Sequence, residues 1–83
     1  MIRVLFFARI RDQLGVPEVA MALEEGVATV AGLTEQLINA HPDFAEVLAR
    51  PNVLIAVNQE FAGPDSPVGD GDEIAYFPPV TGG

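Results

Sequence analysis

The residues whose types and spacing could support chemistry stand at the end of the sequence, Thr81-Gly82-Gly83. Glycine has no Cβ atom, so a chain that ends on two glycines presents its α-carboxylate on the least hindered backbone available. Pro78 and Pro79 stiffen the preceding segment, and an extended run from Pro79 to Gly83 would reach about 17 Å. We expect this tail to thread a narrow channel and to place Gly83 inside a pocket of another protein.

The reacting group of such a tail would be the terminal carboxylate of Gly83. An α-carboxyl group has a pKa of about 3.5, so it is ionised at neutral pH and is a poor electrophile. Adenylation by ATP would supply a leaving group, and a sulfur transfer could then replace the departing oxygen. The alternative is that the two glycines are a frayed end with no chemical role.

Few other residues offer chemistry. The sequence contains no cysteine, which excludes disulfides, zinc–thiolate sites, iron–sulfur clusters and cysteine nucleophiles, and its four basic residues are all arginines. His41 could be a general base, but its position before Pro42 favours a structural role at a helix end. The run from Asp70 to Glu73 lacks the spacing of a calcium loop and favours a turn, with an acidic docking patch as a secondary possibility.

The charge balance restricts the partners. Twelve acidic residues against four arginines give a net charge of −8, which argues against binding to nucleic acids and to anionic membranes. The same charge is compatible with a basic protein partner or with solubility alone. The apolar run near the N-terminus is too short for a signal peptide, so we expect a cytoplasmic protein.

The elements that must position the tail follow from periodicity and turn signals. Thr29 is a suitable N-cap for a helix over residues 30–40, in which Val30, Leu33 and Leu37 share one face. A shorter helical turn is expected over 43–49. The expected strands cover residues 2–8, 18–23, 53–57 and 74–77, with the third buried throughout, 58–60 as a turn and 61–68 irregular. This order predicts one α+β domain, a sheet with a helix across one face.

The alternation of residues along the first and last strands suggests a second surface feature. If Ile2, Val4 and Phe6 face the core, then Phe7 faces the other way, and Phe77 does the same on the last strand. Exposed aromatic residues near a reactive tail indicate a docking patch. The alternative is that a further element covers them.

Over essentially its whole length the sequence resembles the small subunit of molybdopterin synthase, a ubiquitin-like sulfur carrier, and the resemblance is sharpest in three segments. They are Val4 to Arg9 (VLFFAR), Ala56 to Gln59 (AVNQ) and, at greatest length, Asp70 to Gly83 (DGDEIAYFPPVTGG). The resemblance implies a β-grasp fold over residues 1–77, with the first and last strands parallel and adjacent, and a flexible tail over residues 78–83.

The resemblance also implies chemistry and partners. An adenylating enzyme would activate Gly83 with ATP and magnesium, and a sulfurtransferase system would convert it to a thiocarboxylate. The large catalytic subunit of a heterotetrameric synthase would receive the tail, and Gly83 would give sulfur to cyclic pyranopterin monophosphate. The chain itself would bind no cofactor or metal. The implied partner-binding residues are Phe7, Phe61, Phe77, Pro78, Pro79, Val80, Thr81 and Gly82.

Two other functions remain open from the sequence. A sulfur carrier of the thiamine pathway has the same fold and tail chemistry. A ubiquitin-like interaction module would bind partners without using the tail, and deletion of Gly82 and Gly83 would distinguish it from a carrier.

Overall fold

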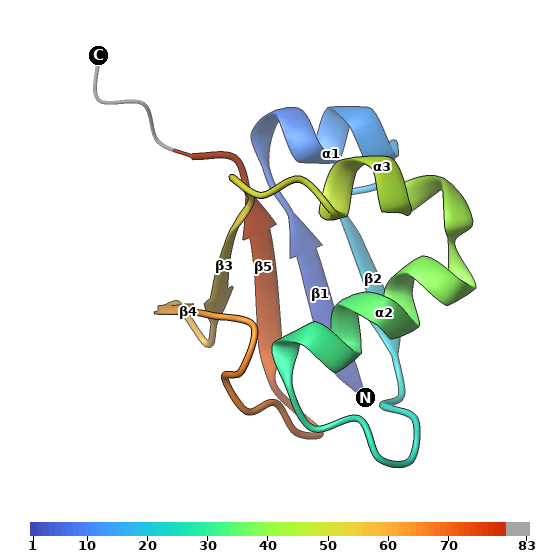
Figure 1. Cartoon of the computed structure of the whole chain (residues 1–83), viewed down its shortest axis with the longest axis vertical. Helices are drawn as coiled ribbons and strands as arrows, with labels where there is room; N and C mark the ends of the chain where they lie inside the picture. Colours follow the sequence, from blue (N-terminus) through green and yellow to red (C-terminus); the bar gives the residue numbers. More distant parts are fainter. Residues whose placement is uncertain (80–83) are drawn as a thin grey trace.

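The computed structural model describes residues 1–79, and Figure 1 shows their arrangement. These residues form five strands, three α-helices and a short 3-10 helix. Their bounds are β1 (Ile2–Phe6), α1 (Ala8–Leu14), β2 (Glu18–Met21), α2 (Val30–Ala40), η1 (Pro42–Phe44), α3 (Ala45–Leu48), β3 (Leu54–Val57), β4 (Glu60–Ala62) and β5 (Glu73–Phe77).

The strands form one mixed sheet in the order β2-β1-β5-β3-β4. The central pair, β1 and β5, is parallel, with Val4 beside Ile74 and Phe6 beside Tyr76. The pairs β1–β2, β3–β5 and β3–β4 are antiparallel. The expected β-grasp arrangement, with the first and last strands adjacent in the middle of the sheet, is therefore confirmed.

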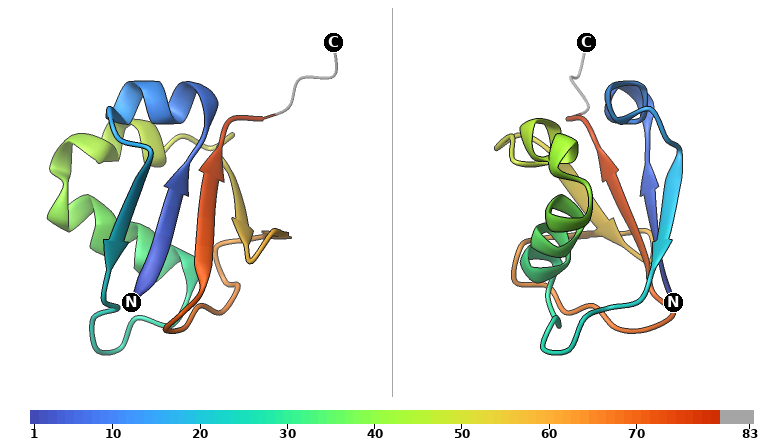
Figure 2. Two further views of the ribbon diagram at one scale, coloured as in Figure 1. Left: turned by 180° about the vertical axis from the view of Figure 1, so that it is seen from behind. Right: turned by 90° about the vertical axis from the view of Figure 1, so that its right-hand side faces the viewer.

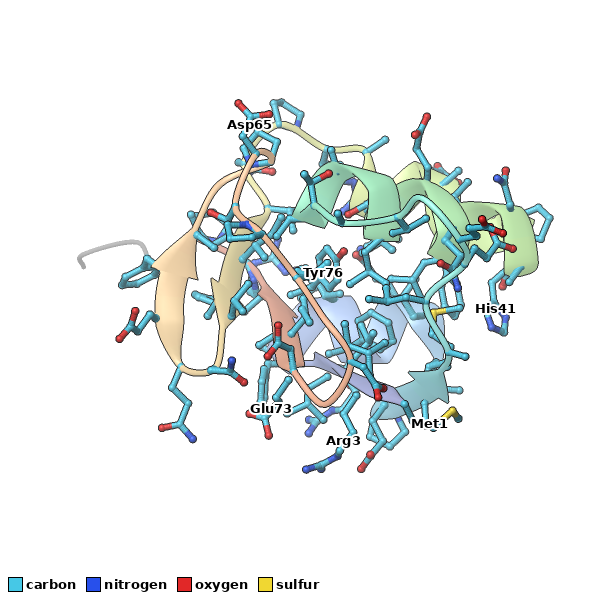
Figure 3. All side chains as sticks on the ribbon, turned by 90° about the horizontal axis from the view of Figure 1, so that it is seen from below. Met1, Arg3, His41, Asp65, Glu73 and Tyr76 are labelled. Carbon is cyan, nitrogen blue, oxygen red and sulfur yellow. The ribbon has the colours of Figure 1, made fainter. Side chains whose placement is uncertain are left out.

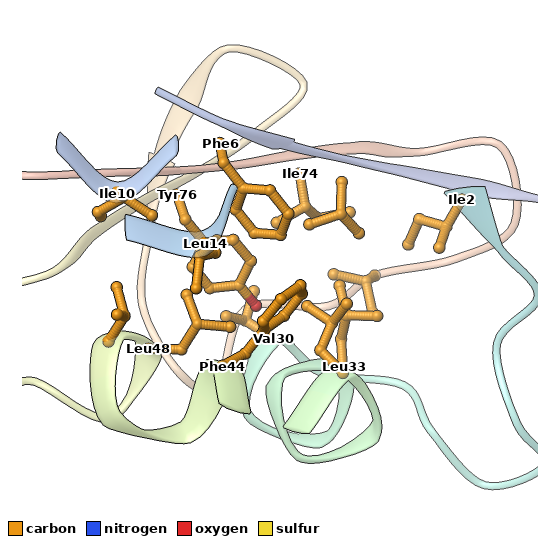
Figure 4. Packing of buried hydrophobic residues seen from close by; sticks show 14 residues of the cluster. Ile2, Phe6, Ile10, Leu14, Val30, Leu33, Phe44, Leu48, Ile74 and Tyr76 are labelled. Atoms are coloured by element: carbon orange, nitrogen blue, oxygen red, sulfur yellow. The ribbon is translucent and has the colours of Figure 1, made fainter. Parts of the chain in front are cut away.

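The helices α2 and α3 cover one face of the sheet, and no helix of residues 1–79 covers the other face (Figure 2). The core lies between these two layers, where the even-numbered residues of the central strands are buried as their alternation predicts. Phe6 packs edge-on against Phe44, and Tyr76 fills the space beneath the helices (Figure 4). The buried Tyr76 hydroxyl lies 2.5 Å from the Thr34 hydroxyl, so its polar end has a hydrogen-bond partner.

The main helix begins and ends where the sequence predicts. The Thr29 side chain accepts a hydrogen bond from the Gly32 N–H at 3.2 Å, which caps α2. His41 ends the helix, and its ring stacks on Phe44 with centroids 4.6 Å apart. The structural role expected for His41 therefore matches its position. The expected helical turn over 43–49 is also present, as η1 and α3.

The prediction of a first strand over residues 2–8 was wrong at its end. The strand stops at Phe6. Ala8 has a φ of 52° and is the first residue of the helix α1. This helix buries Ile10 and Leu14, which are spaced by one helical turn, and Gly15 closes it in the left-handed conformation.

Two predictions on the other side of the sheet also need correction. The strand β3 is half-buried along most of its length, because it lies toward one side of the sheet, where its core-facing residues Ile55 and Val57 are only partly covered; Ala56, on the opposite face, is its one buried residue. The segment after it is not irregular from residue 61, since β4 pairs with β3 through a tight turn. Asn58 and Gln59 both have positive φ, as a two-residue hairpin turn of type I′ requires. Within residues 1–79, no helix is both long enough and apolar enough to span a membrane.

Candidate functional site

The site is built around the end of β5, from which the proposed tail continues. The strand is hydrogen-bonded on both sides up to its last residues: the Phe7 N–H donates to the Tyr76 carbonyl at 3.1 Å, and Phe77 is paired with Leu54. Pro78 and Pro79 follow directly, half-buried and exposed respectively. The sheet therefore fixes the position and direction in which the chain leaves the domain.

Four of the expected site residues lie outside the described residues. They are Val80, Thr81, Gly82 and Gly83. The interaction of the tail with a partner thus stays a prediction from the sequence. The structure describes only the point at the end of β5 where the tail begins.

The structure brings the three predicted aromatic residues to the helix-free face of the sheet. The Phe61 and Phe77 ring centroids lie 5.9 Å apart. Phe7 continues the alternation of β1, beside Phe77 in the extended parallel register. Phe7 is 45% exposed and Phe61 is 80% exposed, so no element of residues 1–79 covers them. We call Phe7, Phe61 and Phe77 the aromatic patch.

Smaller residues fill the space between the phenylalanines. The strand registers place Leu5, Ala75, Ala56 and Phe61 in one row across β1, β5, β3 and β4, and Leu54 lies beside Phe77. These residues all point to the helix-free face, because they alternate with the core residues. The two alanines in the middle of the row have much smaller side chains than the phenylalanines beside them. An apolar surface of this kind, next to the exit of the tail, is suited to contact with a protein partner.

The periodicity of the sequence could identify Phe7 and Phe77 but not Phe61, which entered through the family resemblance. Its position on the patch depends on the hairpin between β3 and β4. A two-residue turn at Asn58-Gln59 was the available signal, although the pair lacks the glycine that commonly marks such turns.

The acidic run at the opposite end of the sheet is a turn, as predicted. Asp72 accepts hydrogen bonds from the Asn58 side-chain amide at 3.0 Å and from the Gly69 N–H at 2.8 Å, and both bonds hold the pKa of its carboxyl below the usual value. The Met1 amino group lies against Asp70, and Arg3 lies 3.4 Å from Glu73 (Figure 3). Among residues 1–79, no group of three or more histidine and acidic side chains could hold a metal ion.

Comparisons with known proteins give a consistent result. The model of the ThiS family matches residues 4–83. A molybdopterin synthase sulfur carrier subunit of Haemophilus influenzae is 43% identical over 83 residues, which cover 100% of both chains.

Solved structures agree with this result. The structure of a putative molybdopterin converting factor, subunit 1, from Pyrococcus furiosus has a TM-score of 0.76 and 35% identity, covering 95% of this chain and 97% of that one. A chain from the complex of subunits 1 and 2 of the molybdopterin-converting factor of Helicobacter pylori has a TM-score of 0.64 and 25% identity. That match covers 99% of this chain and 97% of the other.

Proposed function

Because the chain belongs to the ThiS family, we propose that it is the sulfur carrier subunit of a molybdopterin synthase and that Gly83 is its reacting residue. The observation that supports this proposal most strongly is the extent of the match. The family model runs to Gly83, and the relative from Haemophilus influenzae is matched over its whole length.

The proposed chemistry takes place on the Gly83 carboxylate in three steps. The carboxylate first attacks the α-phosphate of ATP, bound with magnesium in an adenylating enzyme, and pyrophosphate leaves. The outer sulfur of a persulfide on a sulfurtransferase then attacks the acyl-adenylate and displaces AMP, and a second thiol reduces the resulting acyl disulfide, which releases the thiocarboxylate. In the large synthase subunit, the thiocarboxylate sulfur is transferred to cyclic pyranopterin monophosphate, and hydrolysis of the acyl group restores the carboxylate.

The domain contributes position and recognition to this chemistry, and it holds no cofactor of its own. The hydrogen bonds on both sides of β5 give the tail a fixed origin, so the reach of the tail is set by the residues after Phe77. The aromatic patch lies beside this origin and offers an apolar surface to the protein that receives the tail. The proposed partner is the large synthase subunit, in keeping with the complex that subunits 1 and 2 of the Helicobacter pylori molybdopterin-converting factor form. We propose that the reaction takes place in the cytoplasm.

A thiamine-pathway sulfur carrier is the nearest alternative, since it would have the same fold and the same tail chemistry. The names of the curated relatives favour the molybdopterin pathway. The identity of the acceptor separates the two: the thiocarboxylated chain should transfer sulfur to the pterin in the presence of the large subunit and should not support thiazole formation.

Deletion of Gly82 and Gly83 tests the role of the tail. We expect the shortened chain to keep its free energy of unfolding, measured with urea, and to lose all pterin sulfuration in a reconstituted assay. Gly83→Ala serves as a milder variant, because it keeps the length and the carboxylate and adds one methyl group. Pterin sulfuration that survives the deletion would contradict the proposal and would favour a binding module.

A further inference from the structure

The four arginines of this acidic chain fall into two classes. Arg3 lies 3.5 Å from Glu18 and 3.4 Å from Glu73, and Arg11 lies 3.8 Å from Asp12. Arg9 and Arg50 form no ion pair with any side chain in residues 1–79, although the sequence has three acidic residues for each arginine. Neither guanidinium group is thus paired with an acidic side chain of residues 1–79, and both can pair with an acidic group of a partner.

These two arginines come together at the root of the tail. Arg9 belongs to α1, and Arg50 follows α3, and both elements lie beside the end of β5 (Figure 1). A hollow of about 430 Å³ opens between them, with Pro78 and Pro79 in its wall. The Arg50 guanidinium donates a hydrogen bond to the Gln13 side-chain carbonyl at 3.1 Å, which holds it across the hollow toward α1.

The lining of the hollow is suited to an anionic group. Among the described residues it contains Arg9, Arg50 and the amides of Gln13 and Asn52, and it contains no aspartate or glutamate. Ile10 and Val47 give it an apolar floor. Guanidinium and amide groups above an apolar floor can hold a carboxylate by charge-assisted hydrogen bonds.

We propose that Arg9 and Arg50 bind acidic side chains on the protein that receives the tail, at the rim of the channel that the tail enters. This inference rests on the proposed function, because it is the tail that brings the partner to this hollow. The hollow adjoins the origin of the tail, so the partner's surface around the channel must face it. Both arginines are exposed, and exposed cations bind a small free anion weakly, whereas a protein partner supplies further contacts at the same time.

The placement also gives the complex an orientation. An acidic region of a partner is repelled by most of this chain, whose net charge is −8, and it is attracted at the root of the tail. A like-charge penalty elsewhere and an attraction here together favour the one approach that leads the tail to the channel.

The test compares charge-matched variants in binding to the cognate large subunit, measured by calorimetry at two salt concentrations. The double variant Arg9→Gln/Arg50→Gln should weaken the Kd by about tenfold or more and flatten its dependence on salt. The control Arg3→Gln/Arg11→Gln, which removes two positive charges from residues that do not line the hollow, should change the Kd by less than about twofold. The double variant Arg9→Lys/Arg50→Lys should recover most of the affinity, because it keeps both charges.

Three results would overturn the inference. The first is an unchanged Kd for Arg9→Gln/Arg50→Gln. If deletion of Gly82 and Gly83 still abolished sulfur transfer, the proposed function would stand although this inference had failed. Equal losses for the Arg3→Gln/Arg11→Gln control and for Arg9→Gln/Arg50→Gln would indicate a general charge effect.

The third concerns occupancy of the hollow by the chain's own Gly83 carboxylate. In that case removal of residues 80–83 would shift the Nε–H signals of Arg9 and Arg50 in NMR spectra of the isolated chain.

Discussion

The two ends of the central strand pair differ in whether their polar and aromatic groups contact other groups of the same chain. At the end where β1 and β5 begin, the Met1 amino group, Arg3 and Asp72 all contact other groups of the same chain. At the end where the strands finish, Phe7 is exposed beside the origin of the tail, and Arg9 forms no ion pair with any of residues 1–79. The first end is closed by internal contacts, and the second presents groups that have room for a partner.

This difference separates stability from function within one small domain. The closed end fixes the turn from which β5 starts, and the buried faces of β1 and β5 supply the core. The open end costs little stability to change, because its aromatic groups are exposed or half-buried. Substitutions at the two ends should therefore have opposite effects on folding and on partner binding.

The largest expected effect is at the open end. Phe77→Ala should weaken binding to the large subunit by about 2 kcal/mol, because it removes an aromatic side chain at the centre of the apolar surface. The loss in the free energy of unfolding should be smaller, since Phe77 is half-buried. Binding is measured by calorimetry and unfolding by urea titration.

Met21→Ala is the matched control, because it truncates a half-buried apolar residue at the closed end. It should lower stability and leave the Kd unchanged. A Phe77→Ala variant with normal affinity and a large loss of stability would show that the aromatic patch belongs to the folded body.

A second prediction concerns Tyr76, which neighbours Phe77 and faces the core. Burial raises the pKa of the Tyr76 phenol to about 12, and the hydrogen bond with Thr34 opposes this shift. In the unfolded chain the phenol loses its proton near pH 10, so from there to about pH 12 the folded state holds one proton more. The free energy of unfolding should therefore fall by about 1.4 kcal/mol per pH unit over this range.

The sequence makes this measurement clean, because it contains one tyrosine, no cysteine and no lysine. Urea unfolding of the Tyr76→Phe variant should show no fall of this kind between pH 10 and 12. A fall of equal size in the variant would mean that another group titrates, and the burial of the phenol would then not explain the alkaline loss.

The smallest expected effect is at the closed end. Asp72→Ala removes the acceptor for the Asn58 amide and the Gly69 N–H, and it should lower the melting temperature slightly. Thermal unfolding and calorimetric binding to the large subunit check this, and the Kd should stay within about twofold. Asp65→Ala removes the same charge from another exposed turn and should change neither quantity. A clear loss of affinity in Asp72→Ala alone would place a contact surface at the closed end too.

The parts of the fold that could be predicted from the sequence have strong local signals. The Thr29 cap and the apolar face of Val30, Leu33 and Leu37 gave the bounds of α2, and the alternation in β1 and β5 gave the buried face. The helix α1 was missed because it is one residue past the strand and only seven residues long. Ile10, Leu14 and Gly15 carried the signal for it, one turn apart and then a left-handed end.

The site shows the same division between local and long-range information. Phe7 and Phe77 could be placed on one face from strand alternation alone. Arg9 and Arg50 could not be related in this way, since Arg9 lies on α1 and Arg50 follows α3, and they line one hollow only when these elements pack near the end of β5. Phe61 required the register of β4, which the short strand and its Asn58-Gln59 turn do not reveal from composition.

The most direct test of the account is the intact mass of the chain recovered from cells that lack the large synthase subunit, where the sulfurated carrier should accumulate. We predict a fraction with one sulfur atom in place of one oxygen atom, assigned by fragmentation to Gly83, and its absence in cells that also lack the adenylating enzyme. Recovery of the unsulfurated mass alone from cells with an intact adenylating enzyme would contradict the account.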